Sequence, residues 1–467
     1  MKDDIPGVHH HEISSRSPSI KQVATAIPAF IGYTQNAEDV GGEDLTLKPK
    51  RVTSLFEFES FFGDRFIETN LKVTINGDHN HPSAVIPSIE NRSKFIMHYA
   101  MQMYFGNGGG PCWIVSVGDH TNINLNVNHF LDGLKTTENI DEITLYVYPE
   151  AQGLSNPNDF YTLLGSSLDL CAKLMDRFTI MDIWQDPGLV PSAWMDNILT
   201  MRTNSPNDED RIKYGATYFP NLETTLDYYY GGEGTGDTNV TIEGCFTGNL
   251  AALKAFNNTL YFRVQQELRD FPIEMPPSPG IAGIYAKMDA ARGVWKAPAN
   301  INMAMVIKPI INLTSIQQKP LNVDVISGKS VNAIRSFAGR GNALVWGART
   351  LAGNSKEWRY IPVRRFFNMV EESIKKGTER FVFEPNDINT WSRVKSMIYN
   401  FLELQWRAGA LIGNKPEDAF FVKVGLNETM TPIDLMEGRL IVEIGIAVVR
   451  PAEFIILKFS HKMLSSS

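Results

Sequence analysis

The sequence predicts an α/β fold, with a mostly parallel sheet flanked by helices and a separate α+β part at the C-terminal end. Short apolar runs typical of interior strands alternate with helical patterns between residues 93 and 219. Beyond Gly353 the pattern changes to long amphipathic helices. From Leu440 onward, β-branched and aromatic residues dominate, which is typical of strands.

Length and composition narrow the class of protein. A chain of 467 residues has room for two or three domains, and 43% hydrophobic with 21% charged residues is typical of a folded protein. The net charge of −8 and the lack of a basic block argue against a nucleic-acid partner. No apolar run approaches about 18 residues, so membrane insertion is not expected. The first residues lack the apolar core of a secretory signal, so we expect a protein that is at first cytoplasmic.

The first elements follow an N-terminal segment. An apolar run at 26–32 reads as a buried strand. Ser54 is a suitable N-cap with Glu57 three places on, and Gly63 ends the helix that they predict. Residues 64–90 are expected to form a loop.

The α/β alternation continues from there, and a Gly-rich loop is expected at 231–236. The predicted helices are 93–105, 159–176, 192–201, 249–270 and 280–291, and the predicted strands are 112–117, 143–148, 178–183, 213–219 and 303–307.

Two amphipathic helices, 363–376 and 387–407, follow the α/β part. In the second, the apolar face consists of Trp391, Val394, Ile398, Phe401, Leu402 and Gln405. The opposite, polar face is a candidate docking surface, with a plain solvated face as the alternative. Its residues are Arg393, Ser396, Asn400, Glu403 and Arg407.

Strand-like runs at 440–449 and 452–459 leave an apolar edge that needs a partner strand. A short polar arm at the other end of the chain is too poor in apolar residues to fold alone. Arms at both ends suit strand exchange between subunits, and an ordinary hairpin closing its own sheet is the alternative. The candidate strand-exchange residues are Pro6, Gly7, Val8, Glu12, Ile13, Leu440, Val442, Ile444, Ile446, Val448, Phe454 and Ile456.

Motifs for nucleotide chemistry fail on spacing. Gly328-Lys329-Ser330 resembles the end of a phosphate-binding loop, but Val323 stands where that motif requires glycine. The glycines at 232, 234 and 236 follow no strand and open no helix. There is no Gly-x-Ser-x-Gly elbow, and carboxylates near a strand end, such as Asp182, are not distinguished from capping groups. We therefore expect no catalytic or cofactor site.

Metal binding is also not expected. The three histidines 9–11 would point to alternate sides of an extended arm. His79 and His81 lack an evident third ligand, and His98 reads as a satisfied core histidine. The cysteines at 112, 171 and 245 lie far apart in apolar settings, which predicts buried, reduced thiols.

Several segments, taken together, resemble the tail sheath proteins of contractile phage tails and of phage-tail-like contractile injection systems. They are 6–8 with 12–13, 26–33, 106–118, 292–300, 331–335, 339–341, 345–350, 358–365, 383–386, 419–425 and 450–454. The match is strongest from about residue 292 onward. The histidines of the arm, and Val424 in place of a common cysteine, depart from the family pattern.

The resemblance implies stacked hexameric rings around an inner tube, joined by strand exchange between arms, and contraction that drives the tube through a target envelope. The implied partners are further copies of the chain, the inner tube protein, and baseplate and terminal cap proteins. The particle would assemble in the cytoplasm and then be released or attached to an envelope, or form a virion tail. A bacteriophage sheath and an injection-system sheath both remain open, as does an α/β enzyme that shares only ancestry with the family.

The implied domains are an N-terminal arm at 1–25, an α/β sheath domain at 26–354 with surface insertions near 64–90 and 220–247, a C-terminal sheath domain at 355–438 that faces the tube, and a strand arm at 439–467.

Overall fold

The computed structural model describes residues 19–121, 124–454 and 456. The chain divides into two compact units. The larger unit contains Ala24–Asn368 and the described residues from Arg450 onward, and the smaller unit contains residues 19–23 and Met369–Val449. No helix in these described ranges is both long enough and apolar enough to cross a bilayer.

An eight-stranded sheet lies at the centre of the larger unit, in the order β15-β14-β8-β7-β6-β1-β5-β2. Neighbours from β14 to β5 run parallel, and the edge strands β15 and β2 run antiparallel to the strands they join. The mixed α/β fold predicted from the sequence is confirmed. The strands are β1 Pro28–Gly32, β2 Lys50–Val52, β5 Cys112–Ser116, β6 Leu145–Val147, β7 Phe178–Met181, β8 Gly215–Phe219, β14 Val331–Phe337 and β15 Gly341–Trp346.

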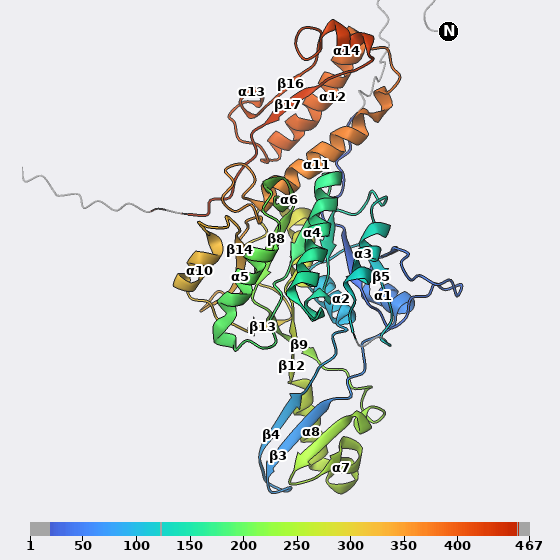
Figure 1. Cartoon of the computed structure of the whole chain (residues 1–467), viewed down its shortest axis with the longest axis vertical. Helices are drawn as coiled ribbons and strands as arrows, with labels where there is room; N and C mark the ends of the chain where they lie inside the picture. The colour runs from blue at the N-terminus through green and yellow to red at the C-terminus, as the bar shows by residue number, and fades with distance from the viewer. Residues whose placement is uncertain (1–18, 122–123, 455, 457–467) are drawn as a thin grey trace, which may run out of the picture. The chain divides into compact units, whose positions relative to one another are not determined.

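Helices cover both faces of this sheet (Figure 1). Successive residues of a strand point to opposite faces, so Phe30 and Ile31 of β1 belong to two different hydrophobic cores. Helices α2 and α9 contribute to the core around Phe30, whereas α3, α4 and α5 contribute to the core around Ile31. These helices are α2 Met97–Gly106, α3 Val127–Thr136, α4 Pro157–Leu174, α5 Trp194–Asn204 and α9 Ser278–Arg292.

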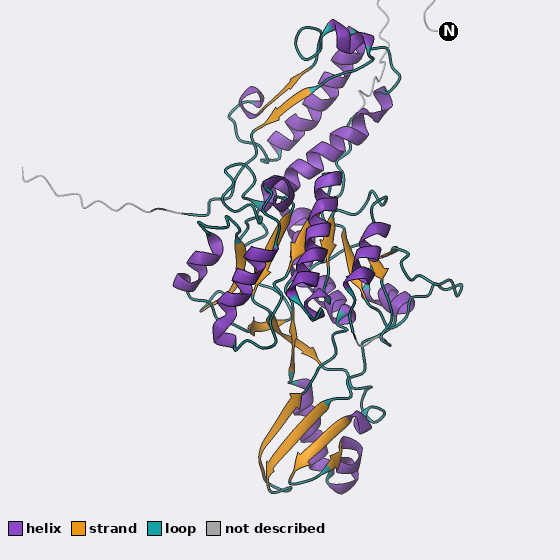
Figure 2. Cartoon of the chain, viewed as in Figure 1, coloured by secondary structure: helices purple, strands orange, loops and turns teal. Residues whose placement is uncertain are grey.

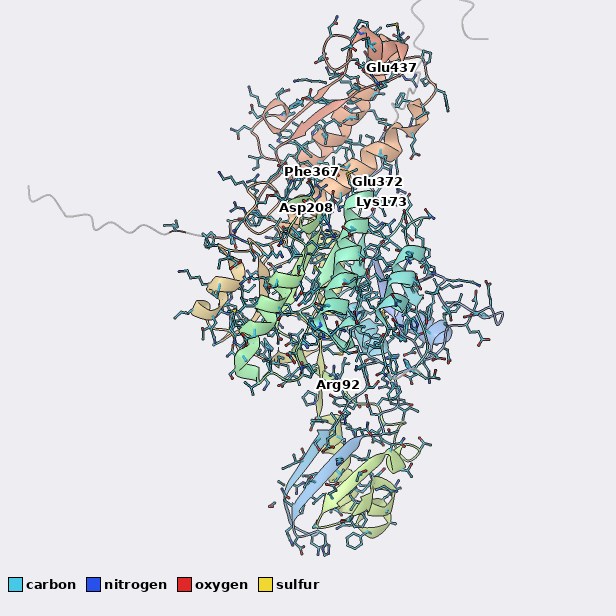
Figure 3. All side chains as sticks on the ribbon, viewed as in Figure 1. Arg92, Lys173, Asp208, Phe367, Glu372 and Glu437 are labelled. Carbon is cyan, nitrogen blue, oxygen red and sulfur yellow. The ribbon has the colours of Figure 1, made fainter. Side chains whose placement is uncertain are left out.

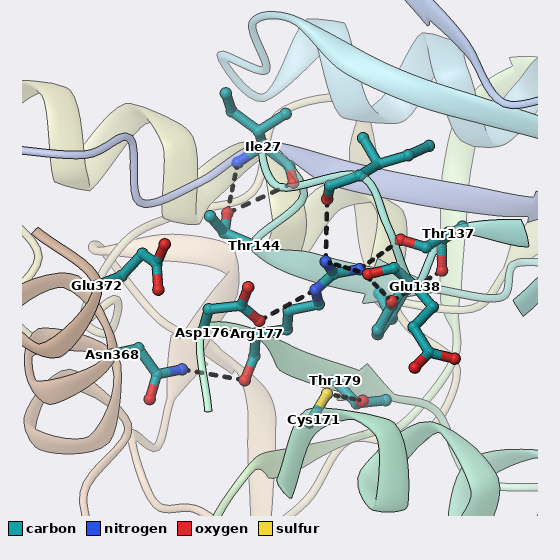
Figure 4. A network of polar contacts seen from close by, with 12 residues as sticks. Ile27, Thr137, Glu138, Thr144, Cys171, Asp176, Arg177, Thr179, Asn368 and Glu372 are labelled. Carbon is teal, nitrogen blue, oxygen red and sulfur yellow. Dashed lines mark hydrogen bonds and ion pairs between the residues drawn. The ribbon is translucent and has the colours of Figure 1, made fainter. Parts of the chain in front are cut away.

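Arg177 fixes the ends of two central strands from inside the larger unit (Figure 4). Its side chain is 1% exposed and donates to the hydroxyl of Tyr146 at 2.7 Å. It also donates to the carbonyls of Thr137 at 2.7 Å and Ile140 at 2.9 Å. The loop after α3 is therefore tied to the start of β7 through one guanidinium.

A four-stranded sheet, in the order β11-β10-β3-β4, forms a separate layer of the larger unit. The prediction of a loop at 64–90 is wrong, because Leu71, Val73 and Ile75 alternate with more exposed residues and form a half-buried strand. The predicted helix 249–270 is also divided, because extended Asn257 ends α7 and caps α8. The elements are β3 Leu71–Gly77, β4 Pro82–Ile89, β10 Val240–Gly244, β11 Gly248–Asn249, α7 Leu250–Phe256 and α8 Asn258–Arg269.

The larger unit also contains a third, smaller sheet and several short helices (Figure 2). A three-stranded antiparallel sheet has the order β12-β9-β13, and its last strand starts at Val306, three residues later than predicted. The predicted cap Ser54 accepts from the amide of Glu57 at the start of α1. The elements are β9 Leu222–Asp227, β12 Pro272–Met275, β13 Val306–Pro309, α1 Leu55–Phe62, α6 Glu209–Ile212, α10 Ser315–Asn322 and the 3-10 turns Ala151–Gly153, Pro191–Ala193 and Asp237–Asn239.

The smaller unit is built on α12, whose apolar face is buried as predicted except for Trp391, which is half-buried. Tyr399 of this helix packs on Phe420 of β16, with ring centroids 5.0 Å apart. Strands β16 and β17 form a two-stranded antiparallel sheet. The elements are α12 Ile388–Arg407, α13 Pro416–Ala419, α14 Pro432–Met436, β16 Phe420–Lys423, β17 Glu443–Ile446, the 3-10 turn Glu379–Phe381 and the later part of α11, Ile361–Thr378.

Candidate assembly surfaces

The first C-terminal run pairs with its own chain. Of the predicted strand 440–449, only Glu443–Ile446 forms β17, which pairs with β16, and Val448 forms a bridge with Leu411. Leu440 and Val442 lie outside the strand. For this run, the alternative of a strand that closes on its own chain is the one observed.

The outer side of β17 is nonetheless an open edge in the described chain. Ala447 turns its backbone toward β16, donating to Ala419 at 2.8 Å and accepting from Ile412 at 2.7 Å. Backbone groups of an antiparallel strand alternate in direction, so those of Ile444, Ile446 and Val448 point away from β16. Because the described sheet has only two strands, this edge is where an added strand would pair.

The second C-terminal run leaves the body of the larger unit as exposed chain. Phe454 is 69% and Ile456 is 79% exposed, and neither lies in a strand. The rest of this run, and the N-terminal candidates Pro6, Gly7, Val8, Glu12 and Ile13, lie outside the described residues.

Just before this exposed chain, the carboxylate of Glu453 is held inside the larger unit. Arg349 donates to it through Nε at 2.9 Å and Nη2 at 2.7 Å. Asn322 donates at 2.8 Å and the Tyr360 hydroxyl at 3.1 Å. Burial raises the pKa of Glu453, but the hydrogen bonds from Arg349 and Asn322 outweigh this effect and lower the pKa overall. Glu453 is therefore the anchored end of the exposed segment.

The polar face of α12 is accessible in the smaller unit. Arg393, Ser396, Asn400 and Arg407 are exposed, and Glu403 is half-buried. The two arginines form exposed ion pairs, Arg393 with Glu384 at 3.3 Å and Arg407 with Glu403 at 2.6 Å. Exposed pairs contribute little to stability, so these charges can exchange partners at low cost.

A cluster of Glu59, Asp64 and His98 is the group of described side chains closest to metal-ligand geometry, with its ligand atoms within 4.8 Å of one another. Nε2 of His98 lies 2.9 Å from Glu59, but its Nδ1 is buried without a partner. A metal-bound histidine normally donates its other nitrogen to an acceptor, so the cluster fits a hydrogen bond between His98 and Glu59 better than a metal centre. The prediction that His98 is a satisfied core histidine is therefore confirmed for Nε2 and wrong for Nδ1.

The residues that suggested nucleotide or thiol chemistry have structural roles. The buried ammonium of Lys329 donates to the carbonyls of Arg202 at 2.6 Å and Ser205 at 2.7 Å, so it is already committed within the protein. Cys112 and Cys171 are buried as predicted, whereas Cys245 is half-buried.

Sequence reasoning missed the Arg349–Glu453 pair, because its members are 104 residues apart and belong to no local pattern. Both members do lie in segments that carry the family resemblance, 345–350 and 450–454.

The fold and these surfaces define a multi-domain α/β protein with a strand edge open to pairing and an anchored, exposed apolar segment. The family model that matches is the phage tail sheath C-terminal domain, over residues 354–462. The chain is similar along 98% of its length to two solved structures. The sheath complex of the extracellular contractile injection system PVC, in the contracted state, is 28% identical, is covered over 98% of its chain and gives a TM-score of 0.65. The helical sheath of the anti-feeding prophage, in the contracted state, is 30% identical, is covered over 99% of its chain and gives a TM-score of 0.63.

The tail sheath protein of Vibrio phage KVP40 is 29% identical over 128 residues, which are 27% of this chain. The matched stretch spans 19% of the length of that protein. The chain belongs to the family of contractile tail sheath proteins.

Proposed function

We propose that this chain is the structural subunit of a contractile sheath, which assembles as stacked hexameric rings around an inner tube and contracts to drive the tube through a target envelope. The observation that carries the proposal is the likeness to contracted sheaths along nearly the whole chain. A fragmentary match would support only a shared domain.

The link between subunits is strand exchange. The outward backbone groups of Ile444, Ile446 and Val448 provide an acceptor edge, and the exposed residues Phe454 and Ile456 belong to a segment able to pair elsewhere. A strand with about six hydrogen bonds, each worth roughly 0.5–1.5 kcal/mol, contributes several kcal/mol before its ordering entropy is subtracted. One such link is modest, but a lattice contains many.

The inner tube docks on the exposed face of α12, through Arg393, Ser396, Asn400, Glu403 and Arg407. Contraction requires contacts that break, and exposed charges form contacts of that strength. In this proposal residues 355–438 face the tube, while 26–354 form the outer and inter-subunit part, with surface insertions near 64–90 and 220–247. Baseplate and terminal cap proteins bind at the two ends of the sheath.

The energy for contraction is stored in a metastable extended assembly, so the subunit needs neither catalysis nor a nucleotide. The particle assembles in the cytoplasm and acts after release or attachment to an envelope. We favour an injection system over a phage tail because the likeness to the two injection-system sheaths spans both chains almost completely.

Electron microscopy of the purified chain, produced together with its tube protein, tests this function. A sheath subunit gives long tubes with a cogwheel-like cross-section around the inner tube. A protein that stays a small discrete particle under all these conditions is not a sheath subunit. Capsid and terminase genes beside its gene would identify a phage, and toxin cargo without capsid genes an injection particle.

A further inference from the structure

The receptor for the Glu453 carboxylate is built into the larger unit independently of Glu453. The Arg349 side chain is 4% exposed, and its Nη1 donates to the carbonyls of Gly353 at 3.1 Å and Asn322 at 3.3 Å. These bonds orient the guanidinium so that Nε and Nη2 face the carboxylate as a two-pronged donor, the geometry that binds carboxylates most strongly.

The receptor is also connected to the central sheet. The backbone amide of Arg349 donates to Oδ1 of Asn332 on β14 at 2.8 Å. The amide nitrogen of the same Asn332 donates to the carbonyl of Thr217 on β8 at 3.1 Å. A continuous series of hydrogen bonds therefore runs from Glu453 into two neighbouring strands of the sheet.

The chain around Glu453 has little else to hold it. Residues 451–454 form neither helix nor strand, and the residues on either side of Glu453, Ala452 and Phe454, are exposed. Arg450 does donate to the carbonyl of Lys356 at 2.9 Å, but from an exposed position. Among the described residues that follow Pro451, Glu453 is thus the one held by side-chain hydrogen bonds, and 21% of its side chain is exposed.

We propose that Glu453 is a positioning residue for strand exchange: it fixes the point at which the C-terminal segment leaves its own subunit and presents that segment to a second copy of the chain. This inference rests on the proposed function. With Glu453 bound, the segment that pairs starts at Phe454, so its first residue keeps a fixed position relative to its own subunit. The same contact carries the pull of a neighbouring subunit through Arg349 into the central sheet.

The test uses the full chain, produced together with its tube protein, with Glu453→Gln. The yield of sedimentable sheath is measured well below the melting temperature of the variant, so that every subunit is folded. We expect roughly a tenfold loss or more, the factor that corresponds to a charge-assisted hydrogen bond. The matched control is Glu233→Gln, which breaks the exposed pair with Arg269 and should leave the yield unchanged.

Two milder variants keep the test decisive if Glu453→Gln does not fold. Tyr360→Phe and Asn322→Ala each remove one neutral donor without uncovering a buried charge, and each should lower the yield roughly two- to tenfold. Wild-type yield from folded Glu453→Gln, or from both milder variants, would overturn the proposal. Failure of the unchanged chain to form sheaths would instead count against the proposed function.

Discussion

Arg365 and Asp289 form a buried ion pair in the larger unit, with Nη2 of the arginine 2.5 Å from Oδ2 of the aspartate and both side chains at most 6% exposed. The hydroxyl of Thr25 donates to the same carboxylate at 2.6 Å, and the Thr25 carbonyl accepts from Arg365 at 2.8 Å. The pair therefore ties the residues just before β1 to α9 and to the first turns of α11.

Replacing Asp289 with alanine should destabilise the subunit strongly. The change leaves the Arg365 guanidinium buried without its counter-charge, which costs about 3–5 kcal/mol. Denaturant unfolding of the free subunit measures the loss. Glu43→Ala, which breaks the exposed pair with Lys48, serves as the control and should cost about 1 kcal/mol or less. Equal losses for the two variants would show that the buried pair stabilises the subunit no more than an exposed pair does.

Arg177→Lys should also destabilise the larger unit, although it keeps the positive charge. Lysine lacks the planar fork that reaches the Tyr146 hydroxyl and three backbone carbonyls at once (Figure 4). Carbonyls left without a donor in the interior cost about 1–3 kcal/mol each. A fall of several kcal/mol in the free energy of unfolding is the expected result, and a fully stable lysine variant would refute the role given to the fork.

The free energy of unfolding of the subunit should depend on pH through Asp182. Burial raises the pKa of Asp182 to about 7, while its carboxylate accepts from the amide of Ser278 at 3.0 Å. Between about pH 4 and pH 7, Asp182 therefore carries a proton in the folded state but not in the unfolded state, where its pKa is near 4. Because the folded state binds more protons, stability falls as the pH rises through this range. Between pH 5 and pH 7 the fall is roughly 2 kcal/mol, because the slope of about 1.4 kcal/mol per pH unit decreases as the pH approaches 7.

Urea unfolding of the unchanged chain and of Asp182→Asn at several pH values isolates this contribution. The asparagine variant should lose that part of the pH dependence while keeping a partner for Ser278. If both proteins show the same slope with pH, Asp182 is ionised in the folded state.

Reversing the charge of Arg393 and Arg407 together should reduce assembly around the tube without affecting folding. Both side chains are more than half exposed, so the substitution breaks two exposed ion pairs and the contact of Arg393 with the Phe381 ring, 5.2 Å from its centroid, at low cost. Sheath yield in the presence of the tube protein is the measurement. The control reverses the same number of charges on the larger unit, at Lys135 and at Lys173, which Figure 3 labels on α4. Normal yield from the Arg393 and Arg407 variant would show that the tube docks elsewhere.

The sequence predicted those elements that depend on the spacing of residues within a single segment. The cap at Ser54, the buried strands at 112–116 and 178–181 and the apolar face of α12 each depend on spacing within one segment. Residues 64–90 were misjudged because prolines and polar residues in the second half, including Pro82 and Pro87, concealed the clear alternation at 71–75.

What the sequence could not predict depends on contacts between distant segments. Arg349 and Glu453 are 104 residues apart, and Arg365 and Asp289 are 76 apart, so no motif contains either pair. Similarly, the composition of β17 predicts a strand but not whether its partner comes from the same chain. Its pairing with β16 on one side and its open edge on the other became visible only in the fold.

The central claim is that strand exchange between subunits holds the sheath together. It is tested most directly by electron microscopy of a chain that lacks residues 1–18 and 454–467, produced with the tube protein. The account predicts folded subunits that form no continuous sheath, because neither arm can add a strand to a neighbour. Sheaths of normal length that still contract, built from the doubly truncated chain, would contradict it.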